Sequence, residues 1–150
     1  MHHFLDKTQV STDVLQKIFA ACDQHYWGMR PTGNDDAKAT TRAVLDSEST
    51  CHIVVCMEDE TPVGFASYAV LVPGVEGKPT LFMKDMFVIE EARGREVGKV
   101  IFSHVRKLAK ELGCARFDWT SEVSNTRATK FYNSVDAEIV SEKIYWRIKI

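Results

Sequence analysis

Residues 93–99 bring together the side chains most suited to hold an anion, reading Arg-Gly-Arg-Glu-Val-Gly-Lys. Glycine lets a backbone approach an anion closely, and arginine and lysine add positive charge. Apolar residues at helical spacing begin within this stretch and continue to Leu112. The first turn of such a helix has N–H groups without partners and the positive end of the helix dipole. The stretch, called the 93–99 loop below, therefore predicts a site for a phosphate or pyrophosphate group.

Two common nucleotide motifs do not fit this loop. A P-loop needs four residues between its glycines and a serine or threonine after the lysine. Here three residues separate Gly94 from Gly98, and Val100 follows Lys99. The dinucleotide pattern Gly-x-Gly-x-x-Gly is also absent. From these residues alone, a tight strand-to-helix turn with solvated arginines is the alternative to an anion site.

The surrounding elements are predicted from hydrophobic spacing and turn residues. Capping residues favour one helix from residues 11–13 to Gly28, and a second that begins at Asn34 or Asp35 and runs through Leu45. After an optional first strand, β-rich runs predict strands over residues 52–57, 63–72, 81–89 and 115–120, with a loop at 73–79. A long helix ending at Gly113, a short helix at 125–132 and a closing strand or hairpin arm at 138–150 complete the order β-α-α-β-β-β-α-β-α-β.

The composition predicts a single globular domain over residues 1–150 and excludes several classes of protein. Hydrophobic residues make up 45% of the chain, enough for a core, and the net charge of -2 argues against a nucleic-acid partner. The four cysteines form no Cys-x-x-Cys pair and no histidine cluster completes a metal site. No apolar run is long enough to span a bilayer. Without a secretory signal, we expect reduced thiols and a cytoplasmic protein.

Two separated motifs resemble those of the GNAT acetyltransferase superfamily. Residues 88–100 resemble its acetyl-CoA motif, Val-x-Pro-x-x-Arg-Gly-x-Gly-x-Gly. A second family motif, Asn-x-x-Ala-x-x-Phe-Tyr followed by Gly-Ala, is matched at Asn125, Ala128, Phe131, Tyr132 and Ala137. The resemblance covers residues 51–150. It implies an α/β (α+β) fold with a mixed, mostly antiparallel central sheet flanked by helices.

The resemblance also implies acetyl-CoA as cosubstrate and a role for each motif residue. Tyr132 matches the general acid that protonates the leaving thiolate, and a phenol stays protonated at neutral pH. Asp85 is the first candidate for proton removal from the amine, with Glu122, His52 or solvent as alternatives. The implied cofactor-binding residues are Met86, Phe87, Val88, Arg93, Gly94, Arg95, Glu96, Val97, Gly98, Lys99, Asn125 and Ala128.

Three residues depart from the family pattern. Glu96 and Asp136 stand where the family usually has glycine, so Glu96 brings a carboxylate toward a pyrophosphate and Asp136 suggests a different turn. Residues 81–88 and 145–150 are similar to the polyamine (diamine) acetyltransferases. Lys84, however, occupies the place of the catalytic glutamate of those enzymes.

The resulting prediction is an N-acetyltransferase that modifies a primary amine of a small molecule or a protein, including polyamine-like and amino-acid-like acceptors. The alternatives are a degenerate GNAT domain that acts as a CoA sensor or interaction module, and an anion-binding regulatory domain. We expect no membrane partner, and a C-terminal strand with alternating apolar residues suggests a homodimer. The acceptor pocket would involve the N-terminal helices, the 73–79 loop and the C-terminal strands, with aromatic candidates Tyr26, Trp27, Trp119 and Trp146.

Overall fold

The computed structural model describes residues 1–28 and 35–150. The chain forms two compact units, Met1–Trp119 and Thr120–Ile150, and each is described by itself. Asn34, one of the two residues predicted to begin the second helix, lies outside the described residues.

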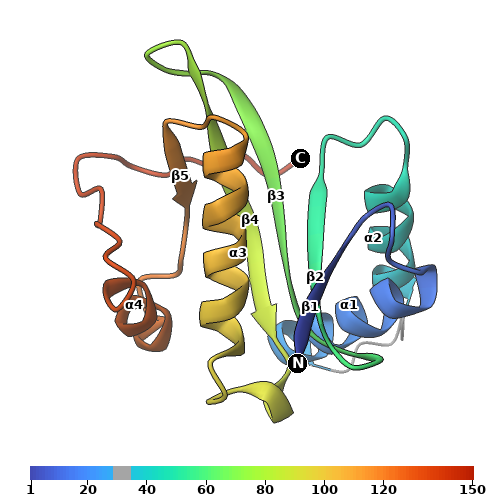
Figure 1. The fold of residues 1–150 in the computed structure, drawn as a ribbon. Coiled ribbons are helices and arrows are strands. Elements are labelled where there is room, and N and C mark those ends of the chain that lie inside the picture. Colours follow the sequence, from blue (N-terminus) through green and yellow to red (C-terminus); the bar gives the residue numbers. More distant parts are fainter. Residues whose placement is uncertain (29–34) are drawn as a thin grey trace. The chain divides into compact units, whose positions relative to one another are not determined.

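The first unit is built on a five-stranded sheet whose strands lie in chain order, from β1 to β5 (Figure 1). Pairing is antiparallel from β1 to β4 and parallel between β4 and β5. The predicted mixed, mostly antiparallel sheet is therefore confirmed. The strands are β1 (His2–Asp6), β2 (His52–Glu58), β3 (Thr61–Val75), β4 (Lys78–Val88) and β5 (Arg116–Trp119).

Helices cover both faces of this sheet. Helices α1 (Thr12–Trp27) and α2 (Asp35–Leu45) lie on one face, and α3 (Val97–Glu111) lies on the other (Figure 1). The predicted start of α1 is confirmed, because the Ser11 side chain accepts a hydrogen bond from the Val14 N–H. No helix among the described residues is long and apolar enough to cross a membrane.

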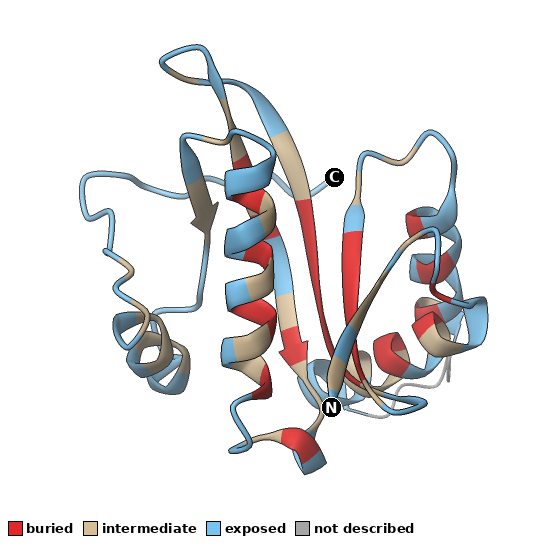
Figure 2. Ribbon diagram, in the orientation of Figure 1, coloured by how far each residue is buried: buried red, intermediate tan, exposed pale blue. Residues whose placement is uncertain are grey.

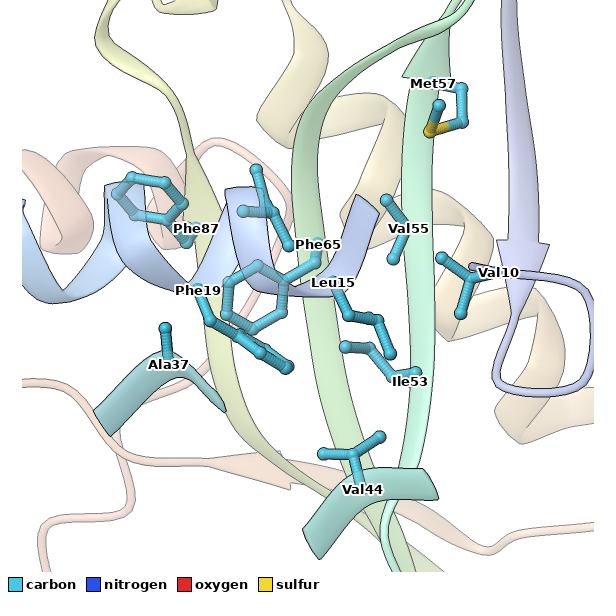
Figure 3. Close-up of a cluster of buried hydrophobic side chains, with 11 residues drawn as sticks. Val10, Leu15, Phe19, Ala37, Val44, Ile53, Val55, Met57, Phe65 and Phe87 are labelled. Atoms are coloured by element: carbon cyan, nitrogen blue, oxygen red, sulfur yellow. The ribbon is translucent and has the colours of Figure 1, made fainter. Parts of the chain in front are cut away.

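The core between the sheet and α1–α2 follows from strand alternation. Phe65 and Phe87 are directly opposed on β3 and β4, so their rings share one face. Phe19 of α1 meets Phe65 edge to face, with ring centroids 5.2 Å apart. Figure 3 shows these rings among the buried side chains that join α1 and α2 to the sheet, which include Leu15, Ala37, Val44, Ile53 and Val55.

Close backbone approach allows α3 to pack on the opposite face. Its buried residues Val97, Ile101 and Val105 recur on the side that faces the sheet (Figure 2). Gly64 of β3 lies beneath them, where an added Cβ would stand 2.7 Å from Ile101 Cδ1 and 2.6 Å from the Phe87 carbonyl oxygen. This glycine therefore sets how closely α3 can sit on the sheet.

The predicted loop at residues 73–79 is wrong. Strands β3 and β4 continue through it as a hairpin, with Val75 paired to Lys78 and left-handed Glu76 and Gly77 at the tip. Gly77 accounts for the turn, because glycine adopts this backbone conformation without a steric penalty. Pro73, Gly74 and Pro79, which also suggested a loop, belong to the ends of the strands instead.

The second unit contains α4 (Thr126–Asn133), which confirms the predicted short helix. The closing strand predicted at residues 138–150 is wrong, because the described residues after Trp119 include no strand. Alternating apolar residues define a face, but a strand forms only when its N–H and C=O groups meet a partner strand. Ile144, Trp146 and Ile148 are exposed within this unit.

Candidate functional site

A short 3-10 helix, η1 (Glu90–Ala92), follows β4. The 93–99 loop then leads from η1 into the first turn of α3, which begins at Val97. The first hydrogen bond of α3 runs from the Val100 N–H to the Glu96 carbonyl, at 3.0 Å. The N–H groups of Val97, Gly98 and Lys99 therefore precede the helical ladder and lie at the positive end of the helix dipole. This is the local geometry that the sequence predicted for an anion site.

Each of the three cationic side chains of this loop has a partner within the fold. Arg93 Nε donates to the Val88 carbonyl at 3.0 Å, and its guanidinium lies 5.8 Å from the centre of the Phe87 ring. Arg95 is 2.8 Å from a carboxylate oxygen of Glu58, and Lys99 is 3.5 Å from Glu96. An arriving anion would therefore meet backbone amides first, and would gain these cations only by drawing them from their partners.

Glu96 has a left-handed backbone, with φ 62° and ψ 7°. A non-glycine residue pays roughly 1–2 kcal/mol for this conformation, because its Cβ approaches the neighbouring carbonyl oxygen. Gly94 has φ 80° without a steric cost. The backbone strain anticipated for Glu96 is therefore present, and its side chain pairs outward with Lys99.

Strand β4 leaves one edge open beside this loop. Its parallel pairing with β5 ends at Met83 and Trp119, and among the described residues no strand pairs with that edge beyond Met83. On the β3 side, Ser67 opposes Asp85 and Tyr68 opposes Met83, so Lys84 is the extra residue of a β-bulge. The bulge and the open edge occur at the same point of the strand.

The alternation of hydrogen bonds identifies which β4 amides face this open edge. The Ile89 N–H donates to the Val63 carbonyl at 3.1 Å, and bonded and non-bonded pairs alternate in an antiparallel ladder. Counting back along the register, the N–H groups of Met86 and Val88 point away from β3 and toward the open edge, whereas the Phe87 N–H points toward β3. Of the three residues predicted to present amides, two have that orientation.

Asp85 and Phe87 both point to the α1 face of the sheet. The Phe87 ring lies near two rings from the end of α1, with centroids 5.8 Å from His25 and 6.4 Å from Tyr26. Burial raises the pKa of the Cys22 thiol of α1 to about 12, and the negative charge of Asp85 contributes to that rise. Burial likewise raises the pKa of the Tyr26 phenol, with a contribution from Asp85.

Asp85 remains accessible on this face. Its side chain is 52% exposed and lies 3.3 Å from the Lys84 ammonium. His52, an alternative base, precedes the buried, α1-facing Ile53, so strand alternation directs it to the opposite face. Its ring stacks on Tyr68 at 5.2 Å. Of these two candidates from the first unit, the structure places Asp85 on the α1 face and His52 on the other.

A pocket of about 800 Å³ opens on the α1 face next to Phe87. Its lining includes the apolar side chains of Ile18 and Pro62 and the polar side chains of Gln24, His25 and Arg93. The volume lies within the usual range for sites that bind small molecules. No sequence motif indicated this pocket, because its walls come from α1, the start of β3 and the end of β4.

Among the described residues, no group of three His, Cys, Asp or Glu side chains can hold a metal ion.

The second motif lies in the second unit. Asn125 caps α4, with its side-chain oxygen accepting a hydrogen bond from the Ala128 N–H at 3.0 Å. The Tyr132 ring lies on α4 next to Phe131, with centroids 5.3 Å apart. Asp136 has a left-handed backbone, with φ 60°, at the end of this helix. The Ala137 N–H bonds to the Tyr132 carbonyl at 3.1 Å, so Asp136 occupies the position that glycine favours in a Schellman cap.

Fold and site together define a class of protein. A mixed, mostly antiparallel sheet flanked by helices is the arrangement that the GNAT resemblance implies. Residues 13–135 match the Acetyltransferase (GNAT) family, and the chain belongs to that family. Acetyl-CoA is the cosubstrate of this family. Together with relatives named as N-acetyltransferases, this identifies the chain as an N-acetyltransferase.

Two curated relatives and one solved structure illustrate the similarity. Aminoglycoside N(6')-acetyltransferase type 1 of Salmonella enteritidis is 25% identical over 132 residues, covering 83% of this chain and 90% of that protein. L-ornithine N5-acetyltransferase NATA1 of Arabidopsis thaliana is 28% identical over 92 residues, which cover 61% of this chain but only 39% of that protein. An integron cassette protein from the mobile metagenome of V. cholerae has a TM-score of 0.89 and 30% identity, with 99% of this chain and 91% of that chain covered.

Proposed function

We propose that this N-acetyltransferase acetylates the primary amine of a small cationic molecule that reaches β4 from the α1 face. One observation carries the proposal. Asp85 and Phe87 point to that face, where Phe87 lines a pocket of about 800 Å³, while the Met86 and Val88 amides of the same strand point to the open edge. Cofactor and acceptor groups would thus meet along one short strand segment.

The cofactor side fits the open edge and the start of α3. Val97, Gly98 and Lys99 would hold the pyrophosphate through their free N–H groups, and Gly94 would let the loop backbone approach it. Met86 and Val88 would bond the extended arm of the cofactor along β4, and an amide at this edge can stabilise a developing oxyanion. Bound acetyl-CoA supplies the activated acetyl thioester.

The acceptor side is formed by Asp85 and nearby groups of α1. A carboxylate in this position would orient an ammonium group and accept its proton or pass it to solvent, because only the neutral amine is nucleophilic. Tyr26 is exposed near it and offers an aromatic face to a cation. The acceptor would displace Lys84 from Asp85, so the loss of this exposed ion pair would reduce acceptor affinity slightly.

Tyr132 is proposed as the general acid for the departing thiolate, and Asn125 and Ala128 as contacts of the cofactor arm. The support is the second family motif together with the Asn125 cap, which fixes the start of the helix that carries Tyr132. The match to the family runs through residue 135 and therefore includes this helix.

The acceptor class is supported by the named relatives. Aminoglycosides and ornithine both carry primary amines, so a small amine is favoured over a protein acceptor. A narrower polyamine specificity, a single domain over residues 1–150, a homodimer, a cytoplasmic location and the absence of nucleic-acid and membrane partners remain predictions. They rest on the sequence alone.

An acceptor screen tests this proposal. Purified protein with acetyl-CoA would be offered aminoglycosides, ornithine, diamines, polyamines and lysine-containing peptides, with the products detected by mass spectrometry. We expect acetylation of at least one small amine and a loss of at least tenfold in kcat/KM with Asp85→Asn. Asp46→Asn is the matched control, because Asp46 is an exposed turn residue whose side-chain oxygen accepts a bond from the Glu48 N–H, a role that asparagine can keep. Acetylation of peptides alone, or full activity in Asp85→Asn, would contradict the proposal.

A further inference from the structure

The 93–99 loop has an anchor that lies outside both family motifs. Glu58, the last residue of β2, accepts a hydrogen bond through Oε2 from Arg95 Nη2 at 2.8 Å, across 37 positions of sequence. This distance is typical of a strong charge-assisted hydrogen bond. The loop that carries the amides of the proposed anion site is therefore tied to β2, which lies two strands away from β4 in the sheet.

The carboxylate of Glu58 is itself well positioned. Glu58 pairs with His2 in the β1–β2 ladder and with Thr61 in the β2–β3 ladder. Its second oxygen, Oε1, lies 3.7 Å from the His2 Nε2 atom, which is buried and makes no hydrogen bond. Only 34% of the Glu58 side chain is exposed. Arg95 thus contacts the carboxylate of a residue whose backbone is held in the sheet by strands on both sides.

Arg93 provides a second anchor of the same kind. It holds the Val88 carbonyl on β4, while Arg95 holds Glu58 on β2, and left-handed Gly94 lies between them. Glu96, which follows Arg95, also has a left-handed backbone. A left-handed residue other than glycine, such as Glu96, persists only where the surrounding structure restrains it. Two arginine anchors on two strands supply that restraint.

We propose that Glu58 is a positioning residue for acetyl-CoA, acting by holding Arg95 so that the amides at the start of α3 are preorganised for the pyrophosphate. In this role Arg95 serves as an anchor and not as a phosphate ligand. The inference rests on the proposed cofactor site, and it is independent of the acceptor. If Glu58 instead kept Arg95 away from the phosphate, removal of the Glu58 carboxylate would tighten acetyl-CoA binding rather than weaken it.

The first test is calorimetric binding of acetyl-CoA without acceptor, so that failure to find an acceptor does not affect it. We expect Glu58→Gln to weaken binding about 2- to 5-fold, the range that a partly exposed ion pair contributes. In turnover assays KM for acetyl-CoA should rise by the same factor while kcat is unchanged. Glu111→Gln is the matched control, because it removes an equal charge from a Glu111–Lys107 pair at the far end of α3. Tighter binding in Glu58→Gln would overturn the proposal.

The second test separates an anchor from a phosphate ligand. If Arg95 acts through Glu58, Glu58→Gln should cause no further loss of affinity in an Arg95→Gln background. The charge-exchanged double variant, Glu58→Arg with Arg95→Glu, should bind acetyl-CoA more tightly than either Glu58→Arg or Arg95→Glu alone, since the pair can re-form. Affinity lower than that of either single variant would show that the phosphate needs the Arg95 charge, and would refute the anchor role. Circular dichroism of each variant confirms that the fold is kept.

Discussion

Replacing Glu96 by glycine should both stabilise the protein and tighten acetyl-CoA binding. Glu96 is left-handed, with φ 62°, and its side chain makes an exposed 3.5 Å ion pair with Lys99. Glycine removes a backbone penalty of roughly 1–2 kcal/mol. Against this, the greater freedom of glycine in the unfolded chain costs roughly 0.5–1 kcal/mol, and the lost exposed ion pair costs a few tenths of a kcal/mol.

The net gain in the free energy of unfolding is therefore about 0.5 kcal/mol. For a chain of this length, that corresponds to a rise of about 1–2 °C in Tm. Removal of the carboxylate should also strengthen anion binding. Two unit charges about 7 Å apart in water interact by about 0.6 kcal/mol, which corresponds to about threefold in the dissociation constant for acetyl-CoA.

Thermal unfolding followed by circular dichroism and calorimetric titration with acetyl-CoA measure the two effects separately. Glu96→Gln is the matched control, because it removes the charge but keeps the side chain and its backbone strain. It should tighten binding without raising Tm. A lower Tm in Glu96→Gly, or weaker binding in both variants, would refute the reasoning and show that the Glu96 carboxylate stabilises the loop.

Three further predictions concern other parts of the molecule. Tyr132→Phe should lower kcat at least tenfold and leave acetyl-CoA affinity within twofold; unchanged turnover would remove Tyr132 as the acid. Gly64→Ala should lower the free energy of unfolding by about 1–3 kcal/mol in urea titrations, because the new methyl group would stand 2.6 Å from the Phe87 carbonyl oxygen. The pKa of Cys22 is raised to about 12 from 9.0, so the folded state favours the neutral thiol. Stability from this group is full below pH 9 and falls as the pH rises toward 12, a loss that Cys22→Ser should reduce in denaturation curves recorded across that range.

Features whose causes lie within a few residues were predictable from the sequence. The caps at Ser11 and Asn125 act on N–H groups three positions away, at Val14 and Ala128. The N–H groups at the start of α3 that precede its first hydrogen bond follow from the helix itself. Glu96 and Asp136 stand out because they occupy positions where the family has glycine, and both have the left-handed backbone that glycine favours.

The strands were predictable as segments, but their partners were not. Alternating apolar residues within 138–150 predicted a closing strand or hairpin arm, and the structure has none there because hydrophobic alternation does not specify a hydrogen-bonding partner. The hairpin through residues 73–79 shows the reverse case. There the pairing of Val75 with Lys78 continues two strands through residues that favour turns.

The sequence by itself determined the helix caps and the glycine-containing turn that leads into α3, since each depends on neighbouring residues, and it carries the two family motifs. Only the tertiary structure decided which backbone and side-chain groups of the loop and of β4 are exposed at the candidate site. The bulge at Lys84 arises from the register with β3, and the orientation of Asp85 arises from the same pairing. The Arg95–Glu58 contact joins residues 37 positions apart. Such contacts depend on how strands are brought together by the whole core, and no local pattern encodes them.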